Sequence, residues 1–379
     1  MSGAVYLDSA ASAPVRRQVL EAMWPFLSAQ HANPSSRHEP GLAAGRALED
    51  ARRRVARRLG ARPAEVIFTS GGTEADNAAV KGIALADPRG RHVLVSALEH
   101  PAVAESAAWL SRIGYTVETV PVDADGTVSP ESLSARLRED TTLVSIQHAS
   151  NEVGTVQDIT TLACLTHETD ARFHTDAVQA AGSERLDVGA LGVDALSLAG
   201  HKLGTPKGVG VLVLRRRTPF EPLLHGGGQQ RERRSGTEDV AGAVGMAAAL
   251  ELAAEDDVAG LRARRDAFIA AVEDRVPGAR LTGSRTARLA GHASFVVAGR
   301  SGESLLLDLE RDGVLCSAGS ACAAGSTEAS PALTAMGVDE ELAQTAIRFS
   351  FGAGTTAAEL ELAAESLASA ARQQVTQKS

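Results

Sequence analysis

Hydrophobic and polar positions between about residues 64 and 214 follow two alternating patterns. Short runs rich in aliphatic and β-branched residues are typical of buried strands, and the segments between them show the apolar spacing of helices. Strands are expected at 65–70, 91–96, 116–122, 142–148, 171–176, 194–199 and 208–214. Helices are expected at 74–87, 101–113, 130–138 and 157–169. This alternation predicts an α/β fold with a mostly parallel seven-stranded sheet flanked by helices.

The segments on either side of this region show another pattern. Helices are expected at 14–29, 41–59, 239–254 and 257–274. The C-terminal third then predicts strands and helices at 293–299, 303–311, 345–352 and 356–372. We therefore expect a large α/β domain at 14–256, and a smaller α+β domain formed by 1–13 together with 257–379.

Composition narrows the classes of protein that this chain fits. Its 379 residues are 44% hydrophobic and 22% charged, which is ordinary for a soluble globular protein. The net charge of −9 argues against direct nucleic-acid binding. No apolar run reaches the roughly 18 residues of a membrane helix, and no signal-peptide pattern opens the chain. Three cysteines are too few for a disulfide framework, so we expect free thiols in the cytoplasm.

Lysine is rare in this chain. Only four of the 38 basic residues are lysines, Lys81, Lys202, Lys207 and Lys378, so 38 − 4 = 34 are arginines. A lysine can act as a neutral amine nucleophile, which arginine cannot do. Two of the four lie in "AGHKLGTPKG". Chance retention remains the simpler explanation for Lys378 and Lys81.

Polar clusters follow five of the predicted strands. The clusters are "SGGTEADN", "LEHP", "SNEVG", "DAVQ" and "GHK", each at the end of a strand. Ligands of open α/β sheets bind at the carboxyl ends of the strands. The sequence therefore predicts one site at this edge.

Each cluster taken alone has a structural and a functional interpretation. Gly72 and Thr73 open a helix and suit an anion, but they also suit an ordinary helix cap. Asp176 is equally well explained as a cap or as the partner of a protonated ring nitrogen. His100 precedes Pro101, and a lone histidine there is more often structural. Together they are more informative than separately.

Lys202 follows a buried strand and adjoins His201. A partly desolvated lysine has a lowered pKa, which favours a Schiff base with a carbonyl group. An amine, a carboxylate and an anion site on one edge match the aldehyde, the pyridinium nitrogen and the phosphate of pyridoxal phosphate. This combination predicts pyridoxal 5'-phosphate as the cofactor.

At this point the chain resembles a known family. It is similar to the NifS/IscS-like cysteine desulfurases, which belong to the class V aminotransferase group of fold-type I pyridoxal phosphate enzymes. The matching motifs, in order, are "YLDSAASAPV", "NPSSRH", "EVIFTSGGTEADN", "LEHPAV", "SNEVGTVQDI", "FHTDAVQAAG", "AGHKLGTPKGVG", "RSGTED", "CSAGSAC" and "AIRFSFG". The resemblance runs nearly end to end.

The resemblance implies a role for each matching residue. Lys202 would bind the cofactor covalently, His100 would stack on its ring, and Asp176 would pair with its ring nitrogen. The implied cofactor-binding set is Gly72, Thr73, His100, Asn151, Asp176, Gln179, Ala199, His201, Lys202 and Thr237. The implied substrate-binding residues are Asn33, Asn151 and Arg348, and the implied catalytic residues are Cys322, Lys202 and His100. Thr237 would reach the phosphate of the neighbouring subunit, which implies a homodimer.

The implied reaction removes sulfur from L-cysteine. It yields L-alanine and a persulfide on Cys322, whose sulfur passes to an acceptor protein. An iron–sulfur scaffold is the commonest acceptor expected, and another thiolation pathway is the alternative. No resident metal is expected, although Cys322 could ligate a cluster transiently during transfer. A selenocysteine lyase, or another class V lyase or aminotransferase, would share the same cofactor site.

Ala199 departs from the family pattern, which has serine or threonine at this position. The missing hydrogen bond to the phosphate is worth roughly 1–3 kcal/mol if nothing replaces it. The change predicts weaker cofactor retention. It is also the one feature that favours a third alternative, a sulfur-carrier scaffold with a degenerate cofactor site.

The three cysteines call for separate interpretations. Cys316 and Cys322 lie in "GVLCSAGSACAAG", which has no histidine to complete a zinc site. Cys164 and Cys316 are expected to fill the core. Cys322 lies in a run of small residues, and that run alone leaves its role open. Lys202 and the family resemblance favour Cys322 as the nucleophile.

Overall fold

The structure is a computed structural model that describes residues 3–86, 89–318 and 329–372. The seven expected strands form one sheet in the order β2-β8-β7-β6-β5-β3-β4. They are β2 (Val66–Thr69), β3 (His92–Ser96), β4 (Thr116–Val120), β5 (Thr141–Ser145), β6 (Arg172–Asp176), β7 (Ala195–Ala199) and β8 (Gly210–Leu214). β8 runs antiparallel to both of its neighbours, β2 and β7, and the other six strands share one direction. The predicted mostly parallel seven-stranded sheet is confirmed.

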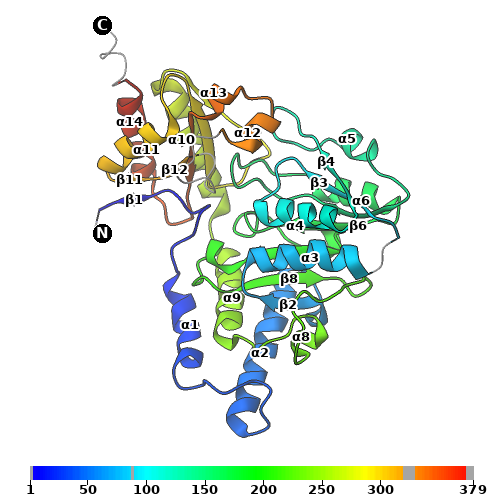
Figure 1. The fold of residues 1–379 in the computed structure, drawn as a ribbon. Helices are drawn as coiled ribbons and strands as arrows, with labels where there is room; N and C mark the ends of the chain where they lie inside the picture. The colour runs from blue at the N-terminus through cyan, green and yellow to red at the C-terminus, as the bar shows by residue number, and fades with distance from the viewer. Residues whose placement is uncertain (1–2, 87–88, 319–328, 373–379) are drawn as a thin grey trace.

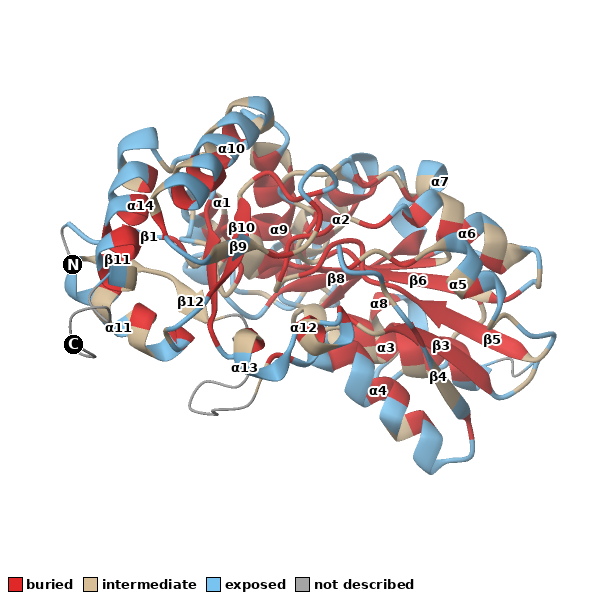
Figure 2. Ribbon diagram, turned by 90° about the horizontal axis from the view of Figure 1, so that it is seen from above, coloured by how far each residue is buried: buried red, intermediate tan, exposed pale blue. Residues whose placement is uncertain are grey.

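Successive side chains of the strands pack alternately against the two faces of this sheet. In β8, Val211 and Val213 join one hydrophobic cluster, whereas Leu212 and Leu214 join another. Successive side chains of a strand point to opposite faces, so a strand buried on both sides is apolar throughout. Figure 2 shows the strands of this sheet, apart from the edge strand β4, buried along most of their length, beneath helices that are exposed on their outer faces.

Different helices cover the two faces (Figure 1). α3 (Gly72–Ala86) and α4 (Pro101–Arg112) pack together on one face. The other face is covered by α1 (Arg17–Leu27), α2 (Glu39–Arg58), α5 (Pro130–Ser134), α6 (Ile159–His167) and α9 (Val240–Ala253). The helix expected at 130–138 ends at Ser134, because a turn there leads the chain into β5.

A second sheet lies in the C-terminal part of the chain. Its order is β12-β13-β10-β9. The strands are β9 (Ala279–Leu281), β10 (His292–Val297), β12 (Ser317–Ala318) and β13 (Ala346–Ser350), packed with α10 (Val258–Arg275), α11 (Gly302–Arg311) and α14 (Ala357–Arg372). β1 (Val5–Tyr6) pairs with β11 (Val314–Leu315), which joins the N-terminal segment to this part. Figure 1 shows these elements at one end of the molecule.

Several short elements have no counterpart in the sequence-based expectations. They are β1, β9, β11, β12, α7 (Val188–Leu191), α8 (Gln229–Glu232), α12 (Pro331–Ala335), α13 (Glu340–Ala343) and the 3-10 turns η1 (Pro63–Glu65) and η2 (Gly200–Lys202). Elements of two to five residues are too short for a periodic pattern to reveal. Among the residues that the structure describes, no helix combines the length and apolarity needed to cross a bilayer.

The C-terminal core depends on a group of edge-to-face phenylalanines. Phe349 is fully buried, and its ring centroid lies 5.1 Å from that of Phe268. Phe349→Ala is expected to lower the free energy of unfolding by about 3–5 kcal/mol, because it removes this contact and leaves a cavity. Urea denaturation measures the change. Leu307→Ala, at an exposed position of α11, is the control, and an equal loss in both variants would contradict the prediction.

Candidate active site

The carboxyl ends of five strands meet at a cavity of about 320 Å³. Ten residues expected at the site from the sequence line it: Gly72, Thr73, His100, Asn151, Asp176, Gln179, Ala199, His201, Lys202 and Arg348. They come from turns that are far apart in sequence, and the last of them belongs to the second sheet. The shared sheet edge therefore gathers these side chains as the strand order requires.

Two expected residues that the structure describes do not line this cavity. Thr237 is exposed and borders a separate pocket of about 100 Å³. Asn33 is exposed in the loop after α1, where its Oδ1 accepts a hydrogen bond of 2.8 Å from the backbone N–H of Ser35. Cys322 lies outside the residues that the structure describes.

Lys202 ends the short turn η2, directly after β7. Gly200 makes this tight turn possible, because a Cβ there would lie 2.4 Å from Thr205 Oγ1. The Lys202 ammonium donates hydrogen bonds to the carbonyl oxygens of Ala10 and, at 2.8 Å, of Ala11. The N-terminal segment thus holds this amine at the cavity wall.

Asp176 is the last residue of β6 and is buried. Its Oδ1 accepts a hydrogen bond of 2.8 Å from the backbone N–H of Val178. Burial raises the pKa of Asp176, whereas the Val178 hydrogen bond and the charge of Lys202 oppose that rise. A cationic group in the cavity would favour the ionised form of this side chain.

His100 caps α4 and also lines the cavity. Its Nδ1 accepts a hydrogen bond of 3.1 Å from the backbone N–H of Ala102, so the proton of the neutral ring is on Nε2. Burial lowers the pKa of His100, which favours this neutral form. The structural and the functional interpretation of His100 are thus compatible.

The first turn of α3 forms another part of the cavity wall. A Cβ on Gly72 would lie 2.9 Å from Val178 Cγ2 and 3.3 Å from the Cβ of Ala199, so this wall admits only small residues. The first N–H groups of a helix have no partner within the helix and attract anions. His201 lies nearby, and burial together with the charge of Lys202 lowers its pKa to about 4. It therefore acts as a neutral hydrogen-bonding group.

Arg348 reaches the cavity from β13 and is 1% exposed. Its Nη2 donates to Asp8 Oδ1 at 2.8 Å, and its Nη1 donates to the carbonyl oxygen of Asn151 at 3.0 Å. Its buried Nε has no hydrogen-bond partner among the described residues. A buried unpaired donor is costly, so this position suits an anionic ligand such as a carboxylate.

The sequence interpretation assigned no role to two buried acids at this site, Asp76 and Glu99. Asp76 lines the cavity, and burial together with the charge of Asp176 raises its pKa well above the usual range. Burial raises the pKa of Glu99 to about 8. The helical spacing from Gly72 to Asp76 was a usable signal, because residues four apart share one helix face.

The segment that carries Thr237 begins with strained backbone. Gln230, Arg231 and Glu232 have φ values of 49°, 58° and 66°, a left-handed conformation that is unfavourable for residues other than glycine. Gln230 is buried, and its Oε1 accepts hydrogen bonds from Arg52 Nη1 at 2.8 Å and from the backbone N–H of Phe68 at 2.9 Å. These contacts hold the strained turn against α2 and β2.

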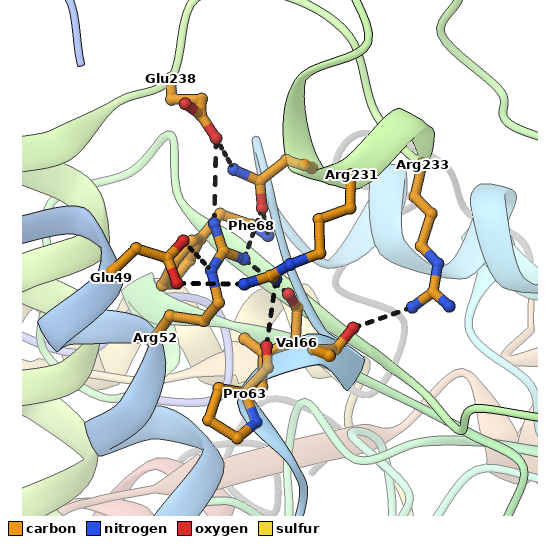
Figure 3. Close-up of polar contacts among 10 residues, drawn as sticks. Glu49, Arg52, Pro63, Val66, Phe68, Arg231, Arg233 and Glu238 are labelled. Atoms are coloured by element: carbon orange, nitrogen blue, oxygen red, sulfur yellow. Dashed lines mark hydrogen bonds and ion pairs between the residues drawn. The ribbon is translucent and has the colours of Figure 1, made fainter. Parts of the chain in front are cut away.

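Arginine side chains make further contacts between the segment that carries Thr237 and helices α2 and α3. Arg52 is 2% exposed and donates to Glu49 Oε1 at 2.9 Å, while Arg231 donates to Glu49 Oε2 at 3.0 Å (Figure 3). Farther along, Arg234 Nε donates to Glu74 Oε1 at 2.8 Å, and Glu74 is the residue after Thr73 in α3. The segment leading to Thr237 is therefore fastened to the helix whose first turn lines the cavity.

The two described cysteines differ in burial. Cys316 packs against the C-terminal core, as predicted, and burial raises the pKa of its thiol to about 12. Such a thiol is a poor nucleophile at neutral pH. The expectation that Cys164 fills the core is wrong, because it is exposed on α6. Leu162 and Ala163 occupy the inward face of that helix instead.

Known proteins match this chain in sequence and in fold. The family model for class-V aminotransferases matches residues 5–362, so the chain belongs to that family. It is 46% identical over 364 residues to "Cysteine desulfurase IscS" of Dictyoglomus turgidum, covering 95% of this chain and 92% of that protein. It is 44% identical over 373 residues to "IscS-like cysteine desulfurase" of Mycobacterium tuberculosis, covering 96% and 95%.

Solved structures agree with these sequence relatives. A protein described as "NIFS-LIKE PROTEIN" superposes with a TM-score of 0.90 at 35% identity, covering 97% of this chain and 98% of that one. "SspA in complex with cysteine" superposes with a TM-score of 0.83 at 33% identity, covering 93% and 99%. The NifS-like fold-type I architecture and the resemblance to cysteine desulfurases are thus confirmed.

The contacts of Gln230 generate a stability prediction. Gln230→Ala is expected to reduce the free energy of unfolding by about 1–3 kcal/mol, because it removes one acceptor of the buried Arg52 guanidinium and the side-chain acceptor of the Phe68 N–H. Chemical denaturation measures the effect. Gln30→Ala, at an exposed position, is the matched control and is expected to change stability by less than about 0.5 kcal/mol. Equal stability of the two variants would contradict the role of Gln230 in holding this turn.

Proposed function

We infer that this protein is a cysteine desulfurase that uses pyridoxal 5'-phosphate. The observation that carries the inference is the meeting of Lys202, Asp176, His100 and the first turn of α3 in one cavity. The names of the relatives and the motif order support the same reaction. The substrate is L-cysteine, and the products are L-alanine and sulfur bound to the protein.

The residues present fit the cofactor. Lys202 would bind its aldehyde carbon, Asp176 would pair with its ring nitrogen, and the first N–H groups of α3 would receive its phosphate together with His201. Gln179 lines the same cavity and would contact the ring hydroxyl. When bound, the cofactor supplies an electron sink that stabilises negative charge on the substrate.

The chain's own groups would orient the substrate and move its protons. Arg348 would bind the substrate carboxylate through the guanidinium edge whose Nε is unpaired. The amine of Lys202, which lines the cavity, would act as the base that removes the substrate Cα proton. His100 would stack on the ring and present its Nε2 proton to the reacting groups. Asn151, which accepts from Arg348, would help to close this side of the cavity.

We propose that Cys322 receives the sulfur. Its thiolate would attack the sulfur of the substrate, forming an S–S bond while the substrate C–S bond breaks. The electron pair of that bond remains with the substrate carbon, which takes up a proton and leaves as L-alanine. The enzyme is left with a persulfide, so atoms and electrons balance without an added oxidant. The persulfide sulfur then passes to an acceptor protein, which we propose to be an iron–sulfur scaffold.

The proposal extends to assembly and domain boundaries. Thr237 is exposed on the attached segment, at a position suited to serve a neighbouring copy in a homodimer. Asn33 is also exposed and is proposed as a contributor to substrate binding in that assembly. Separate hydrophobic clusters support domains at 14–256 and at 1–13 together with 257–379. We propose the cytoplasm as the location.

The persulfide step predicts a clear loss of function. Cys322→Ala is expected to lower sulfide release from L-cysteine, measured with a reductant present, by at least about a hundredfold, because the nucleophile is absent. The absorbance change when L-cysteine is added should remain, because cofactor binding does not need this thiol. Cys164→Ala, at an exposed cysteine, is the control and should keep full activity. Undiminished sulfide release from Cys322→Ala would exclude the mechanism.

Ala199 offers a test of the cofactor site by gain rather than loss. Ala199→Ser places a hydroxyl beside the first turn of α3, so pyridoxal phosphate is expected to bind about three- to tenfold more tightly. Equilibrium dialysis against the cofactor measures the dissociation constant. Pyridoxal without its phosphate is the matched control ligand and should show no gain. An equal gain for both ligands would place the phosphate elsewhere.

A further inference from the structure

Asp76 has no part in the proposed reaction, yet it faces the same cavity as the residues that do. It lies on α3, four residues after Gly72, and is 1% exposed. Its Oδ1 has no hydrogen-bond partner among the described residues. One side-chain atom of each of Asp76, His100 and Asp176 lies within 4.8 Å of the other two. Two carboxyl groups are thus buried side by side.

The sheet beneath Asp76 is polar but supplies no positive charge. Ser145, His174 and Ser197 are completely buried on β5, β6 and β7. His174 Nδ1 lies 2.8 Å from Ser145 Oγ, and its Nε2 lies 2.9 Å from Ser197 Oγ and 3.7 Å from Asp76 Oδ1. Burial lowers the pKa of His174 to about 3, so this ring is neutral. It therefore cannot balance an ionised Asp76.

The other neighbours decide which carboxyl group holds a proton. Asp176 accepts the Val178 N–H and is attracted by the Lys202 ammonium, and both contacts favour its ionised form. Asp76 is stabilised as an anion only by the hydroxyl of Ser197, while Asp176 and Glu99 both disfavour its ionisation. Two like charges this close in a buried site are not both retained. The proton belongs on the group with the weaker stabilisation, which is Asp76.

We propose that Asp76 is a neutral carboxylic acid and acts as a positioning residue, keeping Asp176 as the one carboxylate beside the ring nitrogen of the cofactor. The proposal rests on the proposed function to the extent that Asp176 pairs with that nitrogen. When Asp76 is neutral, Asp176 is the one aspartate of this pair that carries a negative charge to attract the ring nitrogen. It also presents a hydroxyl donor to the cavity where an ionised group would present only acceptors.

Infrared spectroscopy tests the protonation state directly. Cofactor-loaded protein at neutral pH, with and without ¹³C-labelled aspartate, should show the carbonyl stretch of a protonated aspartate that shifts with the label. Asp76→Asn should remove this band, and Glu99→Gln should not. The proposal would be overturned if the wild type showed no carbonyl band that shifts with the label. It would also be overturned if that band persisted in Asp76→Asn. If Asp76→Asn does not fold, Asp76→Ser takes its place.

A titration of the cofactor's visible absorbance gives an independent readout of charge. If Asp76 is neutral, Asp76→Asn should leave the pKa of the cofactor-linked Lys202 nitrogen nearly unchanged. If Asp76 is ionised, its removal should lower that pKa by about one unit or more, because a nearby negative charge favours the protonated nitrogen. A fall of that size would overturn the proposal. Asp176→Asn is the comparison variant, in which a lowered value is expected.

Neither readout depends on turnover of L-cysteine. If Asp76 is protonated but the protein releases no sulfide, the proposed reaction is wrong and this inference stands. An active desulfurase with an ionised Asp76 would remove this inference alone.

Discussion

The balance of charge at the carboxyl end of the sheet is the constraint on which the site depends. Asp176 and Asp76 are buried and line the cavity together with Lys202. Glu99 is half-buried and close enough to disfavour the ionisation of Asp76. Isolated charges cannot be buried in this way, so protons and hydrogen bonds must compensate them. The surroundings favour ionised Asp176, which accepts the Val178 N–H, over ionised Asp76, whose Oδ1 has no hydrogen-bond partner among the described residues. This division prepares the cavity for a cationic ring.

The N-terminal segment connects the two sheets at this point. The carbonyl oxygens of Ala10 and Ala11 accept from Lys202, while the backbone N–H of Ala10 donates to Ser350 Oγ at 2.8 Å. Asp8 pairs with Arg348 only a few residues earlier. The base proposed for the reaction and the arginine proposed for substrate binding are therefore held by one short stretch of chain. A shift of the C-terminal part would be transmitted to both.

Much of this arrangement was predictable, and the errors have specific causes. The order of strands and helices follows from periodicity, and the meeting of polar turns follows from parallel strands. The sequence alone does not single out Asp76, because an acid in the first turns of a helix is common. Its position beside Ser197 and Asp176 in the folded protein makes it unusual. Cys164 was assigned to the core from its position within a helix, although the apolar stripe of α6 leaves it outside.

The sequence by itself determined the α/β class, the sheet edge and the residue types that can hold a cofactor, because these depend on local patterns and on the rules of parallel sheets. It also indicated Lys202 by the scarcity of lysine. Only the tertiary structure decided that Arg348 and Asp8 form a buried pair and that Gln230 holds a strained turn. Only it places Asp76 and Asp176 together in one buried site. Burial and long-range contacts set these properties, and no local pattern of residues encodes them.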